Sequence, residues 1–378
     1  PPYLPNTVMT RPIFDAHLDL AWNALSFDRD LTLELDALNA LESGMKDEPS
    51  RGHCTITLPE LKKAEVPVCV ATLLARSGPN VQRPANGFRR SDLDYGAPHI
   101  AYAMAQGQLA YYRMLEQEGH VRIIKTKEML NSHWESWRES GVLGLIISME
   151  GADPIVSPDH VDQWWEDGLR AVGPVHYGHS QYASGTGVDG LFTPKGFALL
   201  REMERVGITL DVTHLCDSSM AQAFDYFEGP TLASHHNCRS LVPGDRQLTD
   251  EQIKILIKKG GVIGVALDAW MLYPGWIHRE SDRSVVGLEA VVDQIDHVCQ
   301  LAGNTSHSAI GSDLDGGFGN EQTPRDLDSF SDLQKLNGLL EKRGYTSEDI
   351  DAIFFRNWLN FWENALPSEQ PETRHADG

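Results

Sequence analysis

The chain has 378 residues, of which 41% are hydrophobic and 23% charged, a composition typical of an ordinary soluble globular protein. No apolar run approaches the roughly 20 residues that a membrane-spanning helix needs. The formal net charge of −22 argues against a surface for nucleic acid or for an anionic membrane, because phosphate groups would repel it.

Short apolar runs alternate along the chain with longer amphipathic segments. The runs have the length of buried strands, and we predict strands at residues 13–20, 66–74, 143–148, 171–176, 209–213, 231–234, 262–266 and 308–311. Between them we predict helices at residues 101–118, 195–206, 218–227, 249–258, 286–301 and 328–343. Eight strands alternating with helices predict an α/β protein with a parallel sheet, and the number fits a closed (β/α)8 TIM-type barrel better than an open sheet.

Residue types at the helix ends support these boundaries. Thr249 with Gln252 three residues later is a capping-box pattern at a helix start. Gly207 and Gly260 stand where helices commonly end in a left-handed residue.

The remaining segments are predicted to be loops on a single barrel. Residues 28–51 and 77–98 are long and polar, which indicates loop insertions. Residues 367–378 have almost no apolar side chains, so we expect a mobile tail. We find no internal repeat and no dividing linker, and we therefore predict one hydrolase domain over residues 1–378, a size that barrels with insertions commonly reach.

The five cysteines form no closely spaced pair, and their odd number leaves one unpaired in any disulfide scheme. This usage favours a reducing, cytoplasmic compartment. Cys216 follows His214 by two residues and Cys238 follows His235 by three, so a mixed His/Cys zinc site is one alternative.

Residues able to bind a metal ion stand at six of the predicted strand ends. His17 and Asp19 lie two residues apart, so a regular strand would place both on one face, about 6.6 Å apart. The other histidines and acids at strand ends are Glu150, His176, His214, His235 and Asp313. A single one could be a half-buried polar residue or a helix cap. Because the carboxyl ends of barrel strands meet at one rim, the set predicts a metal centre there, suited to two zinc-like ions.

Seven segments between residues 13 and 319 follow the order of a known enzyme family. They are Asp15-Ala16-His17-Leu18-Asp19-Leu20, Met149-Glu150-Gly151-Ala152, Gly168-Leu169-Arg170 with His176, Gly207-Ile208-Thr209-Leu210-Asp211-Val212-Thr213-His214, Ala233-Ser234-His235, Gly260-Gly261-Val262-Ile263-Gly264 and Ile310-Gly311-Ser312-Asp313-Leu314-Asp315-Gly316. As a set they resemble the membrane (renal) dipeptidase family of the amidohydrolase superfamily. The resemblance implies a metallopeptidase that hydrolyses dipeptides, including some with a D-residue at the C-terminus, and it favours a homodimer.

The resemblance also implies a binuclear metal site. His17 and Asp19 would hold one Zn²⁺, and His214 and His235 the other. Glu150 would bridge the two ions. Other divalent metals remain an alternative to zinc.

Three further residues receive roles from the resemblance. His176 would polarise the scissile carbonyl and stabilise the tetrahedral oxyanion, and Arg246, eleven residues after His235, would bind the substrate carboxylate. Asp313 would move a proton from the attacking water to the leaving amine. Two bound cations would lower the pKa of a bridging water and so supply hydroxide at neutral pH.

Two acidic residues beside these motifs are candidates for supporting roles. Asp15 lies two residues before His17 and could orient a ligand imidazole, unless a barrel neighbour satisfies it instead. Asp211 lies three residues before His214, so a regular strand would put it on the opposite face, in a structural role.

The substrate pocket departs from the family pattern. His236 stands beside His235, so either could be the ligand, although alignment favours His235. His179 adds a possible contact, and Gln247 follows Arg246 where Asn is usual. An N-acyl amino acid, a lactone or another carboxylate-bearing amide or ester is therefore an alternative substrate. A non-catalytic metal-binding scaffold is a further alternative.

Overall fold

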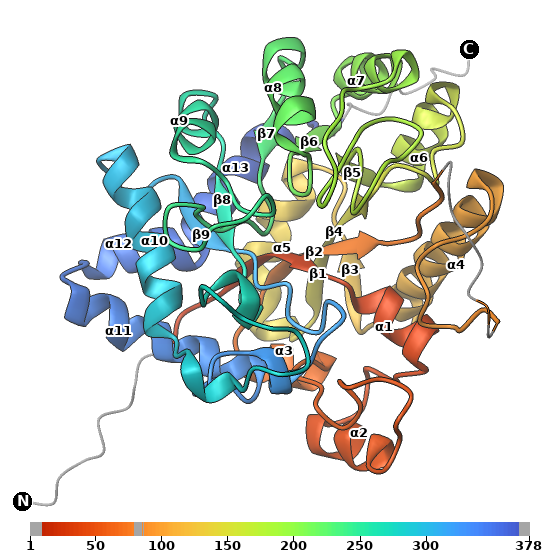
Figure 1. The fold of residues 1–378 in the computed structure, drawn as a ribbon. Helices are drawn as coiled ribbons and strands as arrows, with labels where there is room; N and C mark the ends of the chain where they lie inside the picture. The colour runs from red at the N-terminus through yellow and green to blue at the C-terminus, as the bar shows by residue number, and fades with distance from the viewer. Residues whose placement is uncertain (1–9, 79–84, 86, 370–378) are drawn as a thin grey trace, which may run out of the picture.

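The computed structural model describes residues 10–78, 85 and 87–369. Nine parallel strands form one sheet in the order β7-β6-β5-β4-β2-β1-β9-β8, with β3 paired to β4 outside this path. The helices lie around the outside of the strands (Figure 1). The strands are β1 (Phe14–Leu18), β2 (Val68–Leu73), β3 (Val121–Ile123), β4 (Leu143–Glu150), β5 (Leu169–Gly173), β6 (Thr209–Asp211), β7 (Thr231–Leu232), β8 (Ile263–Val265) and β9 (Ser308–Ile310).

Short contacts between the two end strands close the sheet. Ala233, directly after β7, pairs with Ile263 of β8. Its N–H donates to the Val262 carbonyl at 3.1 Å, and its carbonyl accepts from Gly264 at 2.9 Å. The eight strands of the main path thus form a nearly closed barrel, and each overlaps a predicted strand, so the predicted (β/α)8 fold is confirmed. The ninth strand, β3, was not predicted, because the exposed Arg122 at its centre interrupts the apolar run that marks the other strands.

The helices follow the strands along the chain. They are α1 (Leu20–Phe27), α2 (Leu35–Glu42), α3 (Leu58–Lys63), α4 (Pro98–Gln117), α5 (Lys127–Ser140), α6 (Val161–Asp167), α7 (Pro194–Val206), α8 (Asp217–Tyr226), α9 (Asp250–Lys258), α10 (Glu289–Ala302), α11 (Lys335–Arg343), α12 (Ser347–Asp351) and α13 (Asn357–Ala365). The six predicted helices overlap α4 and α7 to α11. Among the described residues, no helix combines the length and apolarity needed to cross a bilayer.

The helices missing from the prediction are mostly short. α1, α2, α3, α6 and α12 have five to eight residues, too few for a clear helical period. α2 lies inside the segment 28–51, which was predicted to be a loop, so that part of the prediction was wrong. Residues 370–378, most of the predicted mobile tail, lie outside the described residues, as do 79–84 and 86 in the second predicted loop.

Local signals fix the helix ends as expected. Thr249 and Gln252 form both hydrogen bonds of the capping box at the start of α9. Gly207 ends α7 with φ of 91°, and Gly260 follows α9 with φ of 73°, conformations that favour glycine.

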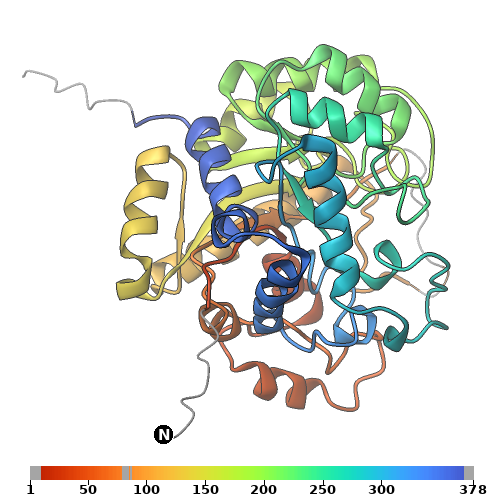
Figure 2. The same ribbon diagram turned by 90° about the vertical axis from the view of Figure 1, so that its left-hand side faces the viewer.

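The barrel interior is apolar, and α13 covers the end of the barrel opposite to the one where the strands finish. A core cluster contains Phe14 and Ala16 of β1 together with Trp358 and Trp362 of α13. The Trp358 indole donates to the Ile310 carbonyl at 2.8 Å, which ties α13 to β9. Figure 2 shows α13 (blue) lying beside α5 (yellow). Because this end is filled, the open end is the one where the strands finish.

A bulge interrupts β1 just below that open end. Asp15 pairs with Cys69 of β2, but Leu18 pairs with Ala71, so three steps on β1 match two on β2. One extra residue shifts the alternation of side chains between faces. The bulge therefore disturbs the regular alternation that would place Asp15 and His17 on the same face of the strand.

Candidate metal centre

The residues singled out in the sequence stand together at the carboxyl ends of the barrel strands. His17 is the penultimate residue of β1 and Glu150 the last of β4. The other five follow strand ends: Asp19 after β1, His176 after β5, His214 after β6, His235 after β7 and Asp313 after β9. All are largely buried, so their polar atoms meet one another rather than bulk water.

Glu150 lies at the centre of the group. Its Oε1 is 3.1 Å from Nε2 of His214, 3.3 Å from Nε2 of His235 and 3.6 Å from Nε2 of His176. Its Oε2 is 3.3 Å from Nε2 of His17 on the other side. Oε1 thus faces three imidazoles and Oε2 faces a fourth, so the carboxylate lies between donors on its two sides.

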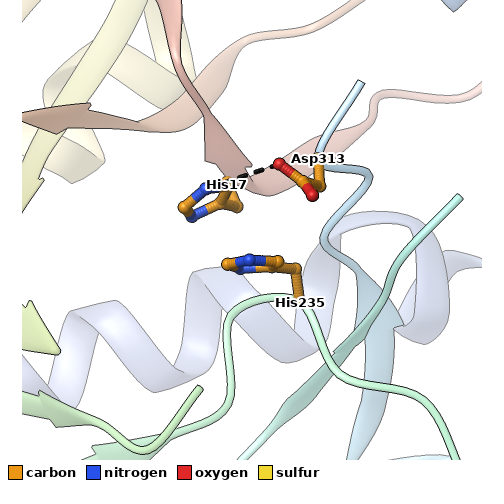
Figure 3. A group of neighbouring side chains, drawn as sticks. All are labelled: His17, His235 and Asp313. Atoms are coloured by element: carbon orange, nitrogen blue, oxygen red, sulfur yellow. Dashed lines mark ion pairs between the residues drawn. The ribbon is translucent and has the colours of Figure 1, made fainter. Parts of the chain in front are cut away.

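His17 faces acidic groups and a second imidazole. Its Nε2 lies 3.7 Å from Asp19 Oδ2 and 3.7 Å from Asp313 Oδ1. Its ring lies 3.7 Å from that of His235, centroid to centroid. Figure 3 shows His17, His235 and Asp313 converging from β1, from the segment after β7 and from the segment after β9. Nε2 of His17 is buried without a hydrogen-bond partner, as expected for an unused ligand atom.

Hydroxyl groups behind the cluster orient several of these side chains. Thr186 Oγ1 lies 3.0 Å from Nδ1 of His214, and Ser234 Oγ lies 2.8 Å from Nδ1 of His235. A hydroxyl can accept the Nδ1 proton, which leaves each Nε2 lone pair directed toward Glu150.

The electrostatics favour an ionised Glu150 beside neutral His214 and His235. Burial by itself raises the pKa of Glu150, but His17 and His176 outweigh it and hold that pKa well below its usual value. Burial lowers the pKa values of His214 and His235 well below the usual imidazole value. These are the protonation states that metal ligation requires. His17 differs from these two: burial lowers its pKa, but the negative charges of Glu150 and Asp19 outweigh burial and raise that pKa, which favours the protonated form unless a cation replaces the proton.

Asp313 occupies a strained position beside the cluster. Its φ is 55° and that of His214 is 71°, both in the left-handed region that non-glycine residues rarely adopt. A Cβ on Gly316 would lie 2.0 Å from Asp313 Oδ1, so glycine there leaves room for the carboxylate. Burial raises the pKa of Asp313 well above its usual value, and the negative charges of Asp19 and Glu150 add to this. A carboxyl group of this kind is able to take up and release a proton.

Arg246 is a buried cation with an unused donor. Its side chain is 2% exposed, and its Nη2 donates to the His235 carbonyl at 2.8 Å. Its Nη1 is buried without a hydrogen-bond partner. An unpaired buried guanidinium nitrogen is costly, and a carboxylate would satisfy it.

These groups border a cavity of about 200 Å³. Its charged walls include Asp19, Arg246 and Asp313, and its apolar walls include Trp22 and Trp270. Pockets for drug-sized ligands typically have about 300–1,000 Å³, so this cavity suits a compact polar ligand.

Other histidines considered in the sequence lie away from the cluster. His236 is buried, but its ring is not among the grouped metal-binding atoms of the described residues. His179 is hydrogen-bonded to Ser184 at 2.9 Å and does not line the cavity. The thiols of Cys216 and Cys238 face the carbonyls of Gly190 and Gln294. A mixed His/Cys site is therefore not formed by the described residues.

The two supporting acids bond to main chain rather than to imidazoles. Asp15 accepts the His17 amide at 2.9 Å and the Ser312 amide at 3.1 Å. Of the two alternatives for Asp15, the structure therefore favours the one in which barrel neighbours satisfy its carboxylate, and the bulge in β1 lies directly beside it. Asp211 accepts the amides of Thr213 and Ser234, which fits its expected structural role.

Two charged residues of the cavity were missed. Arg76 follows β2 and Asp268 follows β8, the two ends among the eight barrel strands at which no candidate was named. Each stands two residues after the end of a predicted strand. A charged residue of either sign at that distance from a strand end is therefore a sequence signal for a cavity residue. Burial raises the pKa of Asp268 to about 7.

Comparisons with known proteins identify the family of this chain. Residues 6–374 match the membrane dipeptidase family, peptidase family M19. The dipeptidase verJ of Clonostachys rogersoniana is 28% identical over 236 residues, which cover 61% of this chain and 57% of that protein. The chain thus spans a little over half the length of this curated relative.

Two solved structures share the fold. The dipeptidase AC, a metallo peptidase of family M19, superimposes with a TM-score of 0.77 and 22% identity, covering 95% of this chain and 100% of that chain. A metallo peptidase from Rhodobacter sphaeroides, liganded with a phosphinate mimic of the dipeptide L-Ala-D-Ala, gives a TM-score of 0.75 and 21% identity over 94% of this chain and 100% of that chain. Because the family match extends over nearly the whole chain, this protein belongs to the membrane dipeptidase family, peptidase family M19.

Proposed function

We propose that this protein is a binuclear zinc dipeptidase that hydrolyses the peptide bond of small dipeptides. The observation that carries the proposal is the position of Glu150, whose two oxygens face His17 on one side and His214 with His235 on the other. A carboxylate between imidazole sets is suited to bridge two divalent ions.

The donor set fits zinc. Nε2 of His17, Oδ2 of Asp19 and Oε2 of Glu150 would hold one ion, and Nε2 of His214 and of His235 with Oε1 of Glu150 the other. Imidazole and carboxylate are ligands that zinc prefers, and the orphaned Nε2 of His17 has no competing partner. When bound, the ions would supply Lewis acidity and lower the pKa of the attacking water.

Three further polar residues of the cavity would bind the substrate carboxylate, donate a hydrogen bond to the scissile carbonyl and transfer a proton. Arg246 would bind the C-terminal carboxylate through its free Nη1. His176 would donate a hydrogen bond to the scissile carbonyl oxygen as negative charge develops there. Asp313 would accept a proton from water and deliver it to the leaving amine, a transfer that its raised pKa favours.

The family relationship and the cavity support dipeptides as substrates. The cavity of about 200 Å³ admits a small molecule, and a related fold binds a mimic of L-Ala-D-Ala. We therefore include dipeptides with a C-terminal D-residue among the proposed substrates.

A substrate panel tests the function directly. The zinc-loaded protein is expected to hydrolyse L,L and L,D dipeptides, to lose activity on chelation and to regain it with zinc. Hydrolysis is measured by release of free amino acids. A metal-replete preparation that ignores the dipeptides but cleaves N-acyl amino acids would support the alternative substrate class.

Replacing Arg246 with methionine is expected to lower kcat/KM for dipeptides about 100-fold, equivalent to about 2.8 kcal/mol of lost charge-assisted hydrogen bonding. The matched control is a dipeptide C-terminal amide, which lacks the carboxylate. The wild-type protein should prefer the free acid strongly, whereas Arg246→Met should treat acid and amide alike. An acid-over-amide preference that survives in Arg246→Met would contradict carboxylate binding by this residue.

A further inference from the structure

Arg76 is held rigidly beside the metal centre by both its main chain and its side chain. Its N–H donates to the Leu93 carbonyl at 2.7 Å, and its carbonyl accepts from Tyr95 at 2.8 Å. Its Nε and Nη2 donate to the two carboxylate oxygens of Asp94, at 2.9 and 2.7 Å. This bidentate pair fixes the plane of the guanidinium, so the remaining nitrogen has one direction available.

That remaining nitrogen faces His176. Nη1 of Arg76 lies 3.0 Å from Nδ1 of His176. Arginine can only donate hydrogen bonds, so Nδ1 of His176 must accept and cannot carry a proton. A neutral His176 ring then carries its proton on Nε2, the nitrogen that points toward Glu150 at 3.6 Å.

The neighbouring histidines have the opposite arrangement. Nδ1 of His214 faces the Thr186 hydroxyl, and Nδ1 of His235 faces the Ser234 hydroxyl. Both hydroxyls can accept a proton from Nδ1 and leave Nε2 free as a ligand atom. Distance alone does not show which histidine is a metal ligand, because possible metal-binding atoms of Glu150, His176 and His214 all lie within 4.8 Å of one another. The chemical nature of the Nδ1 partner does separate them.

We propose that Arg76 is a positioning residue that fixes His176 as the Nε2–H tautomer, so that His176 donates a hydrogen bond to the substrate oxygen and does not ligate an ion. The use of that hydrogen bond in catalysis rests on the proposed dipeptidase function. The tautomer itself rests only on the Arg76–His176 contact.

Direct binding of the substrate carboxylate by Arg76 is the competing explanation. The Nε, Nη1 and Nη2 atoms of Arg76 already face Asp94 or His176. Arg246 by contrast keeps Nη1 without a partner. The two roles predict different kinetics, since loss of a carboxylate contact raises KM and loss of an oxyanion donor lowers kcat.

The test combines ring-nitrogen NMR with kinetics on the zinc-loaded protein. Histidine is labelled with ¹⁵N, and the His176 signals are assigned by their absence in His176→Gln. The wild-type protein should show His176 as the Nε2–H tautomer, and Arg76→Met should lose that preference. Arg76→Met should also lower kcat about 100-fold, the range for one lost oxyanion donor, with KM and zinc content unchanged.

Arg205→Met is the matched control, because Arg205 pairs with Asp162 and Glu202 outside the cavity. It should leave kcat and the His176 tautomer unchanged. Arg76→Lys, which keeps a charged donor, should recover part of both. If Arg76→Met does not fold, Asp94→Asn loosens the same clamp and should shift the tautomer in the same direction.

Three results would overturn the inference. They are an Nδ1–H tautomer in the wild-type protein, an Arg76→Met variant with unchanged tautomer and kcat, and an Arg76→Met variant whose defect lies in KM alone. Failure of the wild-type protein to cleave dipeptides would instead refute the proposed function, and the NMR measurement would still decide the tautomer.

Discussion

Replacing Asp313 with asparagine is expected to lower dipeptide turnover about 1,000-fold, within the range for loss of a general acid–base. Asparagine preserves the size of the side chain and the room left by Gly316, but it cannot take a proton from water or return one to the leaving amine. The loss corresponds to about 4 kcal/mol of transition-state stabilisation. It is measured as kcat under saturating substrate and zinc.

Metal content separates a proton-transfer defect from a binding defect. Asp313 lies 3.7 Å from Nε2 of His17 but is not needed in the proposed ligand set, so Asp313→Asn should retain two zinc ions per chain. Asp159→Asn, at an exposed position on a surface turn, is the control and should change neither quantity. Turnover within about tenfold of wild type in Asp313→Asn would refute the proton-transfer role, since acid–base catalysis is typically worth about 10²–10⁴-fold.

The second large effect is expected for Glu150→Gln, which should abolish binuclear zinc binding and with it detectable dipeptide hydrolysis. An uncharged amide cannot offer an anionic oxygen to each side, although its shape fills the same space among the four imidazoles. Elemental analysis should give at most one zinc per chain. Zinc at about 100 times the Kd of each site should stabilise wild type by about 2.7 kcal/mol per bound ion, and this gain should shrink in the variant.

Glu60→Gln is the matched control for burial of a carboxylate. Glu60 is 5% exposed and accepts the Ser331 amide at 3.0 Å, a bond that glutamine can keep. This variant should retain two zinc ions and full turnover. A Glu150→Gln protein that still binds two zinc ions and turns over dipeptides would refute the bridging role.

The barrel and the residues at its rim could be predicted because their signals are local. An apolar run of four to eight residues indicates a buried strand without knowledge of its neighbours. The carboxyl ends of all strands in a barrel lie on one side, so the topology alone gathers His17, Glu150, His214, His235 and Asp313. The start of α9 at Thr249 could be predicted for the same reason, since a helix cap involves only the adjacent turn.

The role of Asp15 could not be predicted, because it depends on a one-residue irregularity. Sequence periodicity assumes a regular strand, but the bulge between Asp15 and Leu18 shifts the faces. Asp15 consequently accepts the His17 and Ser312 amides and joins β1 to the segment after β9.

Local sequence patterns thus located the eight strands of the barrel and the set of ionisable groups at its rim. Which atoms of those groups meet depends on how distant segments pack against one another. This packing brings Arg76 to His176 across 100 residues of chain, and it leaves Nη1 of Arg246 buried without a hydrogen-bond partner. The physical reason is range: strand and helix signals act over a few residues, whereas hydrogen-bond partners depend on how distant segments pack.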